Sequence, residues 1–566
     1  MLNSLLLRDQ KTEVDVCRWP AIVILAATML LGAPPRETRA ATAPHAMVAA
    51  EGDLAAHAGL DVLARGGNAV DAAVAIALVL GVTNSGSCGI GGGGFMLIYR
   101  AQEHKVYALD YREVAPQAAS PTMYEREGKI DEKLAQTGAL AVAVPGELAG
   151  LDVALKRFGS MKFAALAAPA IRLAREGYTL SPHMARDVMI AQEQLKQDPG
   201  FRAVFFKPDG SPLAAGDTVH HPNLALLMEA LGDAPRDNFY HGHIAEQIAA
   251  FLKAQGGLLT AADLAAYQPV WREPIHLGYR GYEMYTMPPP SSGGVVLEML
   301  GMLAPGHLGG LGFESPAYLA QLIEVMRQGF VDRDQYADPA FIKVPVAQLL
   351  SPEHIAEARR LALHHQEAAQ VTVAHDHGTS NFCVVDRAGN VVDVTSTINT
   401  IFGARIMDAE IGLILNDEMD DFAVAPGVPN AFKLVQAEAN AIAPGKRPLS
   451  SMAPLIAMRD GRPAMVVGGS GGPTIITGVT QVTVEALDLR MDAADAVGAP
   501  RIHEQAQPAT VFVEKSLPAT AAASLVKMGY PIKVIPELGA VSAIRIGPGE
   551  LDGAFDPRKG GAAVGN

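Results

Sequence analysis

The chemistry of this chain is indicated first by a glycine followed by a threonine, Gly378–Thr379, at the start of a β-rich run that ends at Asp386. If the bond between the two residues were cut, Thr379 would carry a free α-amine beside its own hydroxyl. A nucleophile and a general base would then share one residue, as in the threonine form of an activated nucleophile. The alternative is a strand that simply begins after a glycine turn, so other features of the chain must decide.

Composition excludes several classes of protein. The chain has 566 residues, of which 49% are hydrophobic and 19% are charged, so it is expected to fold around sizeable cores. Its formal net charge of −15 argues against nucleic acid or an anionic membrane surface as its main partner. We therefore expect a globular protein that binds no nucleic acid.

The segment 1–43 is typical of an export signal. Arg18 precedes an apolar run from Trp19 to Leu31, and small residues follow up to Ala43. The run is shorter than a usual membrane span and suits the apolar part of a signal peptide. An uncleaved anchor is the alternative. A signal predicts a periplasmic or secreted protein.

Neither the cysteines nor the histidines predict a metal site. Cys17 lies in the signal segment, and Cys88 and Cys383 are expected to be two separate buried thiols, although the sequence leaves a disulfide open. The histidines between residues 362 and 377 have no fixed ligand spacing. We interpret the polar segment that holds them as a cleavable linker, and we expect no metal and no other cofactor.

Helices and one strand are predicted before Thr379. The glycine-rich run 89–94 precedes a strand rather than a helix, which excludes a dinucleotide-binding fingerprint. Apolar residues at three- and four-residue spacing predict several helices, one of them capped by Asn68. These helices are expected at 54–64, 69–82, 146–158, 163–176, 295–303 and 315–336.

The character of the chain changes after Thr379. Two β-rich runs, 381–386 and 391–398, flank a turn typical of a hairpin. A strand at 465–467 leads through a glycine-rich turn into a helix predicted at 474–489. Sheets with helices outside them predict an α/β layered architecture.

Several motifs follow one another in a fixed order: GGNAVDAA at 66–73, DYREVAP at 110–116, VPGE at 144–147, TS at 379–380, TSTINT at 395–400, LNDEMDDF at 415–422, KRPLSSM at 446–452, GG at 471–472 and DPRKGGAA at 556–563. In this order they resemble the γ-glutamyltranspeptidase family, over roughly residues 45–566. The resemblance implies a four-layer αββα sandwich of the N-terminal nucleophile hydrolase type.

The resemblance also implies a self-cleaving precursor. The Thr379 hydroxyl is expected to attack the Gly378 carbonyl, giving a large subunit, 44–378, and a small subunit, 379–566, in one folded unit. The mature enzyme would then transfer or hydrolyse the γ-glutamyl group of glutathione and related amides through a Thr379 acyl-enzyme. Water, an amino acid or a dipeptide would be the acceptor.

Family positions give roles to further residues. Thr397 is expected to hold the nucleophile in place, and Gly471 and Gly472 are expected to offer backbone N–H groups to an oxyanion. The segment 426–432 resembles a lid loop, with Phe432 as its gating aromatic residue.

Six residues are expected to recognise the zwitterionic end of a glutamyl group. A carboxylate suits a bidentate arginine with two hydroxyl donors, and an ammonium suits two acids and an amide. The residues are Arg112, Ser450 and Ser451 for the α-carboxylate, and Asn399, Glu418 and Asp421 for the α-ammonium.

Two other interpretations stay open. A relative of the same fold could cleave glutaryl side chains of β-lactams or polyglutamate amides. Since a glutaryl group has no α-amine, such an enzyme would have less use for Asp421. The second alternative is a binding protein that neither cuts itself nor catalyses, and the intact Thr379 and Thr397 argue against it.

Overall fold

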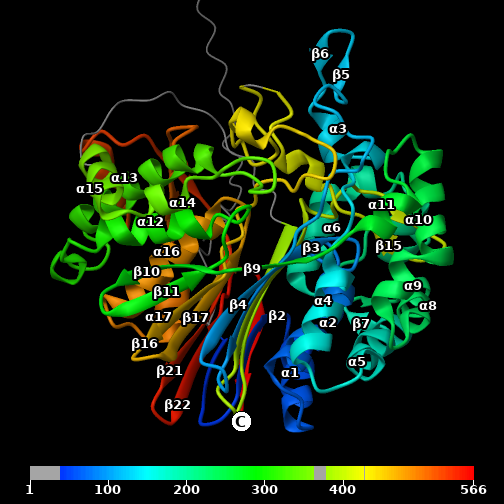
Figure 1. Cartoon of the computed structure of the whole chain (residues 1–566), viewed down its shortest axis with the longest axis horizontal. Helices are drawn as coiled ribbons and strands as arrows, with labels where there is room; N and C mark the ends of the chain where they lie inside the picture. The colour runs from blue at the N-terminus through cyan, green and yellow to red at the C-terminus, as the bar shows by residue number, and fades with distance from the viewer. Residues whose placement is uncertain (1–38, 363–377, 426) are drawn as a thin grey trace, which may run out of the picture. The chain divides into compact units, whose positions relative to one another are not determined.

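The computed structural model describes residues 39–362, 378–425 and 427–566, which lie in one compact unit. The histidine-rich segment and most of the predicted signal lie outside the described residues. Within them, two seven-stranded sheets pack face to face between two layers of helices (Figure 1). This arrangement confirms the predicted four-layer αββα sandwich.

One sheet carries Thr379 on a central strand. In spatial order its strands are β23 (Gly561–Gly565), β2 (Met47–Glu51), β12 (Gly378–Val385), β13 (Val391–Asn399), β3 (Gly93–Arg100), β4 (Lys105–Tyr111) and β9 (Val270–Arg272). Neighbouring strands are antiparallel throughout. β12 and β13 form the predicted hairpin, and β3 confirms the strand expected after the glycine run.

The other sheet carries the glycine pair at the end of a strand. In spatial order its strands are β1 (Arg39–Ala43), β22 (Glu550–Phe555), β21 (Ala540–Gly547), β17 (Arg462–Ser470), β16 (Leu455–Arg459), β11 (Tyr282–Thr286) and β10 (Ile275–Tyr279). β17 ends directly before Gly471. β1 falls inside the segment predicted as a signal, and that boundary at residue 43 stays a prediction.

Alternate residues of β12 face different layers. Phe382 and Val384 lie in the core beneath the helices, whereas Cys383 and Val385 lie in the core between the sheets. Both faces are therefore covered, which explains why the strand is buried along its whole length. Cys88 and Cys383 are free and buried, which confirms two separate thiols.

Helices cover the outer face of each sheet (Figure 1). The layer beside the Thr379 sheet and its extension contain α1 (Asp53–Ala64), α2 (Ala69–Thr83), α3 (Lys133–Gln136), α4 (Glu147–Phe158), α5 (Phe163–Glu176), α6 (Pro182–Leu195), α7 (Pro199–Phe205), α8 (Pro222–Leu231), α9 (Pro235–Tyr240), α10 (Gly242–Ala254) and α11 (Ala261–Ala266). The opposite side contains α12 (Gly293–Leu303), α13 (Pro316–Asp332), α14 (Val346–Leu349), α15 (Pro352–Ala362), α16 (Thr474–Leu487), α17 (Ala493–Gly498) and α18 (Ala519–Lys527).

Short strands lie at the periphery. They are β5 (Glu125–Arg126), β6 (Lys129–Ile130), β7 (Tyr178–Thr179), β8 (Thr218–Val219), β14 (Met407–Asp408), β15 (Leu413–Ile414), β18 (Ile502–His503), β19 (Val511–Glu514) and β20 (Ile532–Ile535). In the part of the chain that the structure describes, no helix combines the length and apolarity needed to cross a bilayer.

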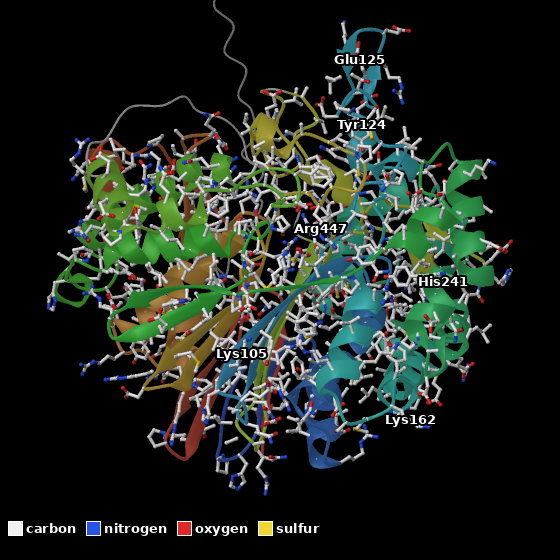
Figure 2. All side chains as sticks on the ribbon, viewed as in Figure 1. Lys105, Tyr124, Glu125, Lys162, His241 and Arg447 are labelled. Atoms are coloured by element: carbon white, nitrogen blue, oxygen red, sulfur yellow. The ribbon has the colours of Figure 1, made fainter. Side chains whose placement is uncertain are left out.

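Charged side chains are mostly at the surface, but some anchor the motifs from within. Lys105, Glu125 and Lys162 are exposed, whereas Arg447 is buried (labelled in Figure 2). Arg447 Nε is 3.4 Å from Asp110 Oδ1 and its backbone N–H donates to Asp338. This buried ion pair fixes the start of the loop that carries Ser450 and Ser451.

Candidate active site

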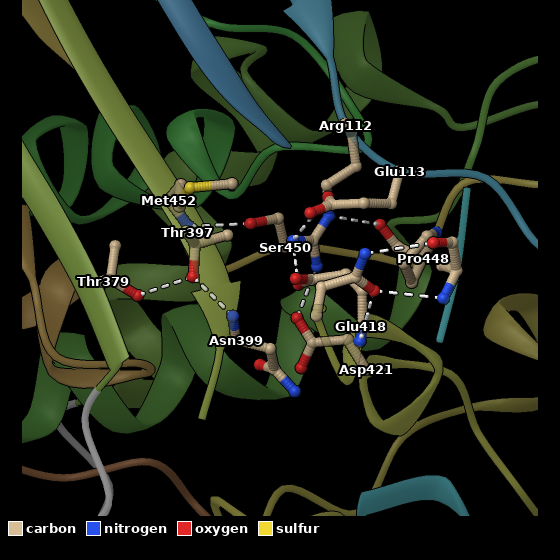
Figure 3. Close-up of polar contacts among 12 residues, drawn as sticks. Arg112, Glu113, Thr379, Thr397, Asn399, Glu418, Asp421, Pro448, Ser450 and Met452 are labelled. Carbon is tan, nitrogen blue, oxygen red and sulfur yellow. Dashed lines mark hydrogen bonds and ion pairs between the residues drawn. The ribbon is translucent and has the colours of Figure 1, made fainter. Parts of the chain in front are cut away.

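Thr379 and Thr397 face each other across the hairpin. Their hydroxyl oxygens are 3.0 Å apart, and the Thr397 hydroxyl donates to the Gly378 carbonyl at 2.8 Å (Figure 3). The backbone N–H of Asn399 also donates to Thr397 Oγ1. Since the single hydroxyl hydrogen of Thr397 goes to Gly378, the hydrogen between the two hydroxyls must come from Thr379. Thr397 thus orients the Thr379 hydroxyl and polarises the carbonyl before it.

A β-bulge lies beside this pair. Gly378 pairs with Asn399 and Thr379 pairs with Thr397, so Ile398 is an extra residue on β13. Asn399 takes a positive φ of 78° there. A Cβ added to Gly378 would lie 2.2 Å from the carbonyl oxygen of Thr400. The backbone around the Gly378–Thr379 bond is therefore packed so closely that only glycine fits.

A lysine that the sequence reasoning missed holds the other side of Thr379. Lys559 Nζ donates to the Thr379 carbonyl at 2.6 Å and lies 3.7 Å from Glu51 Oε1. Both side chains are buried. Lys559 belongs to the C-terminal motif, but nothing in its spacing from Thr379 could show the contact.

The predicted zwitterion residues form one buried cluster in which opposite charges meet. The Arg112 guanidinium donates to Glu418 and to Asp421, and its Nε donates to the Pro448 carbonyl at 3.3 Å (Figure 3). A third acid, Glu113, lies 3.8 Å from Arg112. The cation and the acids neutralise one another. A zwitterion that entered could take over both sides of this pairing.

Burial sets the ionisation of these acids. Desolvation raises the pKa of Glu418 to about 7, although the nearby Arg112 opposes the shift. Desolvation also raises the pKa of Asp421, again against Arg112. Glu113, which lacks a direct hydrogen bond from Arg112, has its pKa raised well above the usual range by burial and by Glu418.

The remaining polar residues lie around this cluster. Asn399 Nδ2 donates to the Asp417 carbonyl at 3.1 Å, and Ser450 Oγ accepts from the backbone N–H of Met452. Arg333, which the sequence reasoning missed, approaches Ser451 Oγ at 3.4 Å from Nη2. Arg333 is buried, so a second cation lies beside Ser451.

The glycine pair forms a turn between β17 and α16. Gly471 and Gly472 both have positive φ, 130° and 57°, a region that favours glycine. A Cβ on Gly472 would lie 2.7 Å from the Phe432 ring. The turn therefore needs glycine both for its backbone and for the close approach of the aromatic side chain.

The predicted lid segment is tied to the acidic loop. Phe432 is buried, and its backbone N–H donates to Asn430 Oδ1 at 3.1 Å. Asn430 Nδ2 in turn donates to Asp421 Oδ1 at 3.2 Å. Residue 426 of the predicted segment lies outside the described residues. The contacts link Phe432 through Asn430 to one of the zwitterion residues.

One small pocket collects most of the predicted site. Gly378 and Gly471 do not line it, and Met452 and Ile475 line it without having been predicted. The predicted residues that do line it are Arg112, Thr379, Thr397, Asn399, Glu418, Asp421, Phe432, Ser450, Ser451 and Gly472. The Thr379 hydroxyl thus shares a cavity with a charge cluster suited to a zwitterion.

Comparison of the sequence with known proteins agrees with this geometry. The family model for gamma-glutamyltranspeptidase matches residues 55–566. The glutathione hydrolase proenzyme of Escherichia coli (strain K12) is 40% identical over 528 residues, 91% of each chain. The glutathione hydrolase proenzyme of Pseudomonas aeruginosa is 39% identical over 538 residues, 93% of this chain and 95% of the relative.

Solved structures share the fold. The cephalosporin acylase from Bacillus halodurans has a TM-score of 0.83 and 29% identity over 93% of this chain and 97% of its own. A chain of Helicobacter pylori gamma-glutamyltranspeptidase has a TM-score of 0.53 and 35% identity over 56% of this chain and 91% of its own. The expected fold type is therefore confirmed, and the chain belongs to the gamma-glutamyltranspeptidase family, whose members are enzymes of the N-terminal nucleophile hydrolase fold.

Proposed function

We propose that this protein cuts itself before Thr379 and then hydrolyses or transfers the γ-glutamyl group of glutathione and related γ-glutamyl amides. The observation that carries the proposal is the shared pocket, in which the Thr379–Thr397–Gly378 hydrogen-bond chain lies beside the Arg112 charge cluster. Relatives that are named glutathione hydrolase proenzymes support it.

Self-cleavage needs the Thr379 hydroxyl, the peptide bond that precedes it and one water molecule. Thr379 Oγ attacks the Gly378 carbonyl carbon, its proton passes to the Thr379 nitrogen, and the C–N bond breaks as an ester forms. Water then hydrolyses the ester, which leaves a carboxylate on Gly378 and a free α-amine on Thr379. The large subunit would be 44–378 and the small subunit 379–566. Thr397 assists by polarising the Gly378 carbonyl.

Gly378→Ala is expected to slow self-cleavage by about 10- to 100-fold. The added Cβ would lie 2.2 Å from the Thr400 oxygen, and relieving such an overlap typically costs ~1–3 kcal/mol and shifts the scissile carbonyl. The rate is read from the appearance of the two fragments on a denaturing gel. Gly278→Ala is the control, since its Cβ meets nothing closer than 4.0 Å. Equal cleavage rates in the two variants would contradict the role given to Gly378.

The mature reaction follows from the freed amine. The α-amine of Thr379 takes the hydroxyl proton while Oγ attacks the γ-carbonyl of the donor. Gly471 and Gly472 stabilise the oxyanion with their N–H groups, and the leaving amine takes the proton as the C–N bond breaks. Water, an amino acid or a dipeptide then attacks the ester and regenerates Thr379.

Selection of the γ-glutamyl substrate depends on the buried charges of Arg112, Glu418 and Asp421. The α-carboxylate of a γ-glutamyl group would accept from Arg112, Ser450 and Ser451, while its ammonium would donate to the Asn399 side-chain oxygen, Glu418 and Asp421. Both halves of the zwitterion must be present for the buried charges to be matched. Phe432 would close over the bound donor and limit access of water.

A pair of anilides tests this selection directly. We expect γ-glutamyl anilide to be cleaved with a kcat/KM at least about 10³-fold above that of glutaryl anilide, which lacks only the α-amine. The structural likeness to a cephalosporin acylase makes the comparison decisive. Comparable turnover of both anilides would favour the acylase alternative, and turnover of neither would contradict the proposed activity.

This preference is expected to depend on pH through Glu418. Its raised pKa of about 7 means that Glu418 is ionised above that pH and neutral below it. The ratio of kcat/KM for the two anilides should therefore fall as the pH drops from about 8 to about 5, whereas steps common to both substrates cancel. Glu418→Gln should give a lower ratio that changes less with pH, since only Asp421 is left to titrate against the ammonium. A ratio that stays constant in the parent enzyme would contradict this role of Glu418.

Export to the periplasm or out of the cell is also proposed. It rests on the apolar run after Arg18 and the small residues that follow. Enzyme recovered from the exported fraction should carry a large subunit that lacks this run. Active enzyme confined to the cytoplasm with the run intact would contradict export.

A further inference from the structure

A second buried cluster of chemically active side chains lies away from the active-site pocket. It consists of Glu298 on α12, Asp332 at the end of α13 and His354 on α15, three helices that lie side by side (Figure 1). The ligand atoms of the three residues all lie within 4.8 Å of one another. None of the three lines the active-site pocket. We propose that this cluster binds a divalent transition-metal cation of the zinc class.

The spacing of the three side chains suits a single metal centre. His354 Nε2 is 3.2 Å from Glu298 Oε1 and 3.4 Å from Asp332 Oδ2. Ligands about 2.1 Å from a tetrahedral zinc ion stand about 3.4 Å apart, so small side-chain movements would complete the geometry. A single imidazole nitrogen carries at most one hydrogen and cannot fully satisfy two carboxylates. A cation in contact with all three groups can.

The charges of the two buried acids are a second argument for a metal ion. Glu298 is fully buried and Asp332 is 6% exposed. Among the described residues, no lysine or arginine pairs with either acid, and the donors to Asp332 other than His354 are the neutral amides of Gln328 and Gln335. Two adjacent carboxylates without a cation are costly to bury. A divalent ion would neutralise both.

An unsatisfied oxygen points to the same conclusion. Glu298 Oε2 is buried and has no hydrogen-bond partner within the described part of the chain. The competing explanation is a proton shared between the two acids, and the experiment below separates the two.

The chemistry of the donors selects the class of metal. One imidazole nitrogen with two carboxylate oxygens suits zinc, whereas calcium and magnesium prefer oxygen ligands alone. Three protein ligands leave room for water as a fourth. The ion would bind α12, α13 and α15 together, next to Arg333, the residue that approaches Ser451. Its first role would be to stabilise this helix layer.

Zinc titration of the chelator-treated, purified enzyme tests the site. We expect one Zn²⁺ per chain by calorimetry, and at least a tenfold loss of affinity in Glu298→Gln and in His354→Gln. His276→Gln is the matched control, because His276 also contacts an acid, Glu283, but at the surface. Its zinc affinity should equal that of the parent. No saturable zinc binding in the parent, or parent-like binding in both cluster variants, would overturn the proposal.

Thermal unfolding distinguishes a variant that has lost zinc binding from one that has failed to fold. In EDTA, Glu298→Gln should unfold at the same temperature as the parent or above it, since the variant removes one of two adjacent buried acids. Added Zn²⁺ should raise the Tm of the parent and leave that of Glu298→Gln unchanged. If Glu298 and Asp332 share a proton instead of binding a metal, added Zn²⁺ should leave the Tm of the parent unchanged as well.

Discussion

Thr379→Ala is expected to leave the chain in one piece and to lower γ-glutamyl transfer by roughly 10⁴-fold or more. The change removes the oxygen that would attack Gly378 and would later carry the γ-glutamyl group, while the Cβ that packs in β12 stays. Cleavage is read on a denaturing gel and activity from the release of aniline. The fold should be kept, because the lost contact is one hydrogen bond to Thr397.

Thr379→Ser is the matched control for this prediction. Serine keeps the hydroxyl and, after cleavage, the α-amine, so both self-cleavage and transfer should be retained at a reduced rate. An alanine variant that is still cut before residue 379, or that keeps parent-like transfer, would contradict Thr379 as the nucleophile.

Arg112→Lys is expected to lower kcat/KM for a γ-glutamyl donor by about 10²-fold or more, chiefly through KM. Lysine keeps the positive charge beside Glu418 and Asp421 but loses the planar pair of N–H groups that suits a carboxylate. Self-cleavage should continue, because the residues around the scissile bond are held by Thr397 and Lys559 instead.

Two further variants make the Arg112 result interpretable. Arg459→Lys is the control, since the Arg459 side chain is 61% exposed and should tolerate the change. Arg112→Met is expected to destabilise the protein by roughly 3–5 kcal/mol, because it leaves buried acids without their cation. An Arg112→Lys enzyme with unchanged KM for the γ-glutamyl donor would contradict the carboxylate-binding role.

Local signals in the sequence were enough to predict most elements near the site. Asn68 caps α2 through a reciprocal capping box with Asp71, as its position before an apolar run predicted. The ends of these helices and strands were less predictable. The helix expected at 315–336 ends at Asp332, and a 3₁₀-helix continues to Gln335. The spacing of apolar residues does not distinguish an α-helix from a 3₁₀-helix. β17 extends to Ser470 because its glycines pair with β21, which propensity alone does not show.

Some residues of the site could be predicted from local sequence, whereas others come together only through the fold. Ordered motifs predicted most of the residues that line the pocket, since each motif is local in sequence. Lys559 and Arg333 were missed because their contacts with Thr379 and Ser451 depend on how distant segments fold together. The pairing of Arg112 with Glu418 and Asp421 was also not foreseen, because the cation and the acids were expected to bind opposite charges of a substrate rather than one another.

N-terminal sequencing of the fragments in the purified, active enzyme tests the central claim most directly. The mechanism predicts two fragments, of which the smaller begins Thr-Ser-Asn-Phe, the residues from Thr379 onward. Activity should appear in step with this new N-terminus. An uncut chain with full γ-glutamyl transfer activity, or a cut at another bond that leaves Thr379 internal, would contradict it.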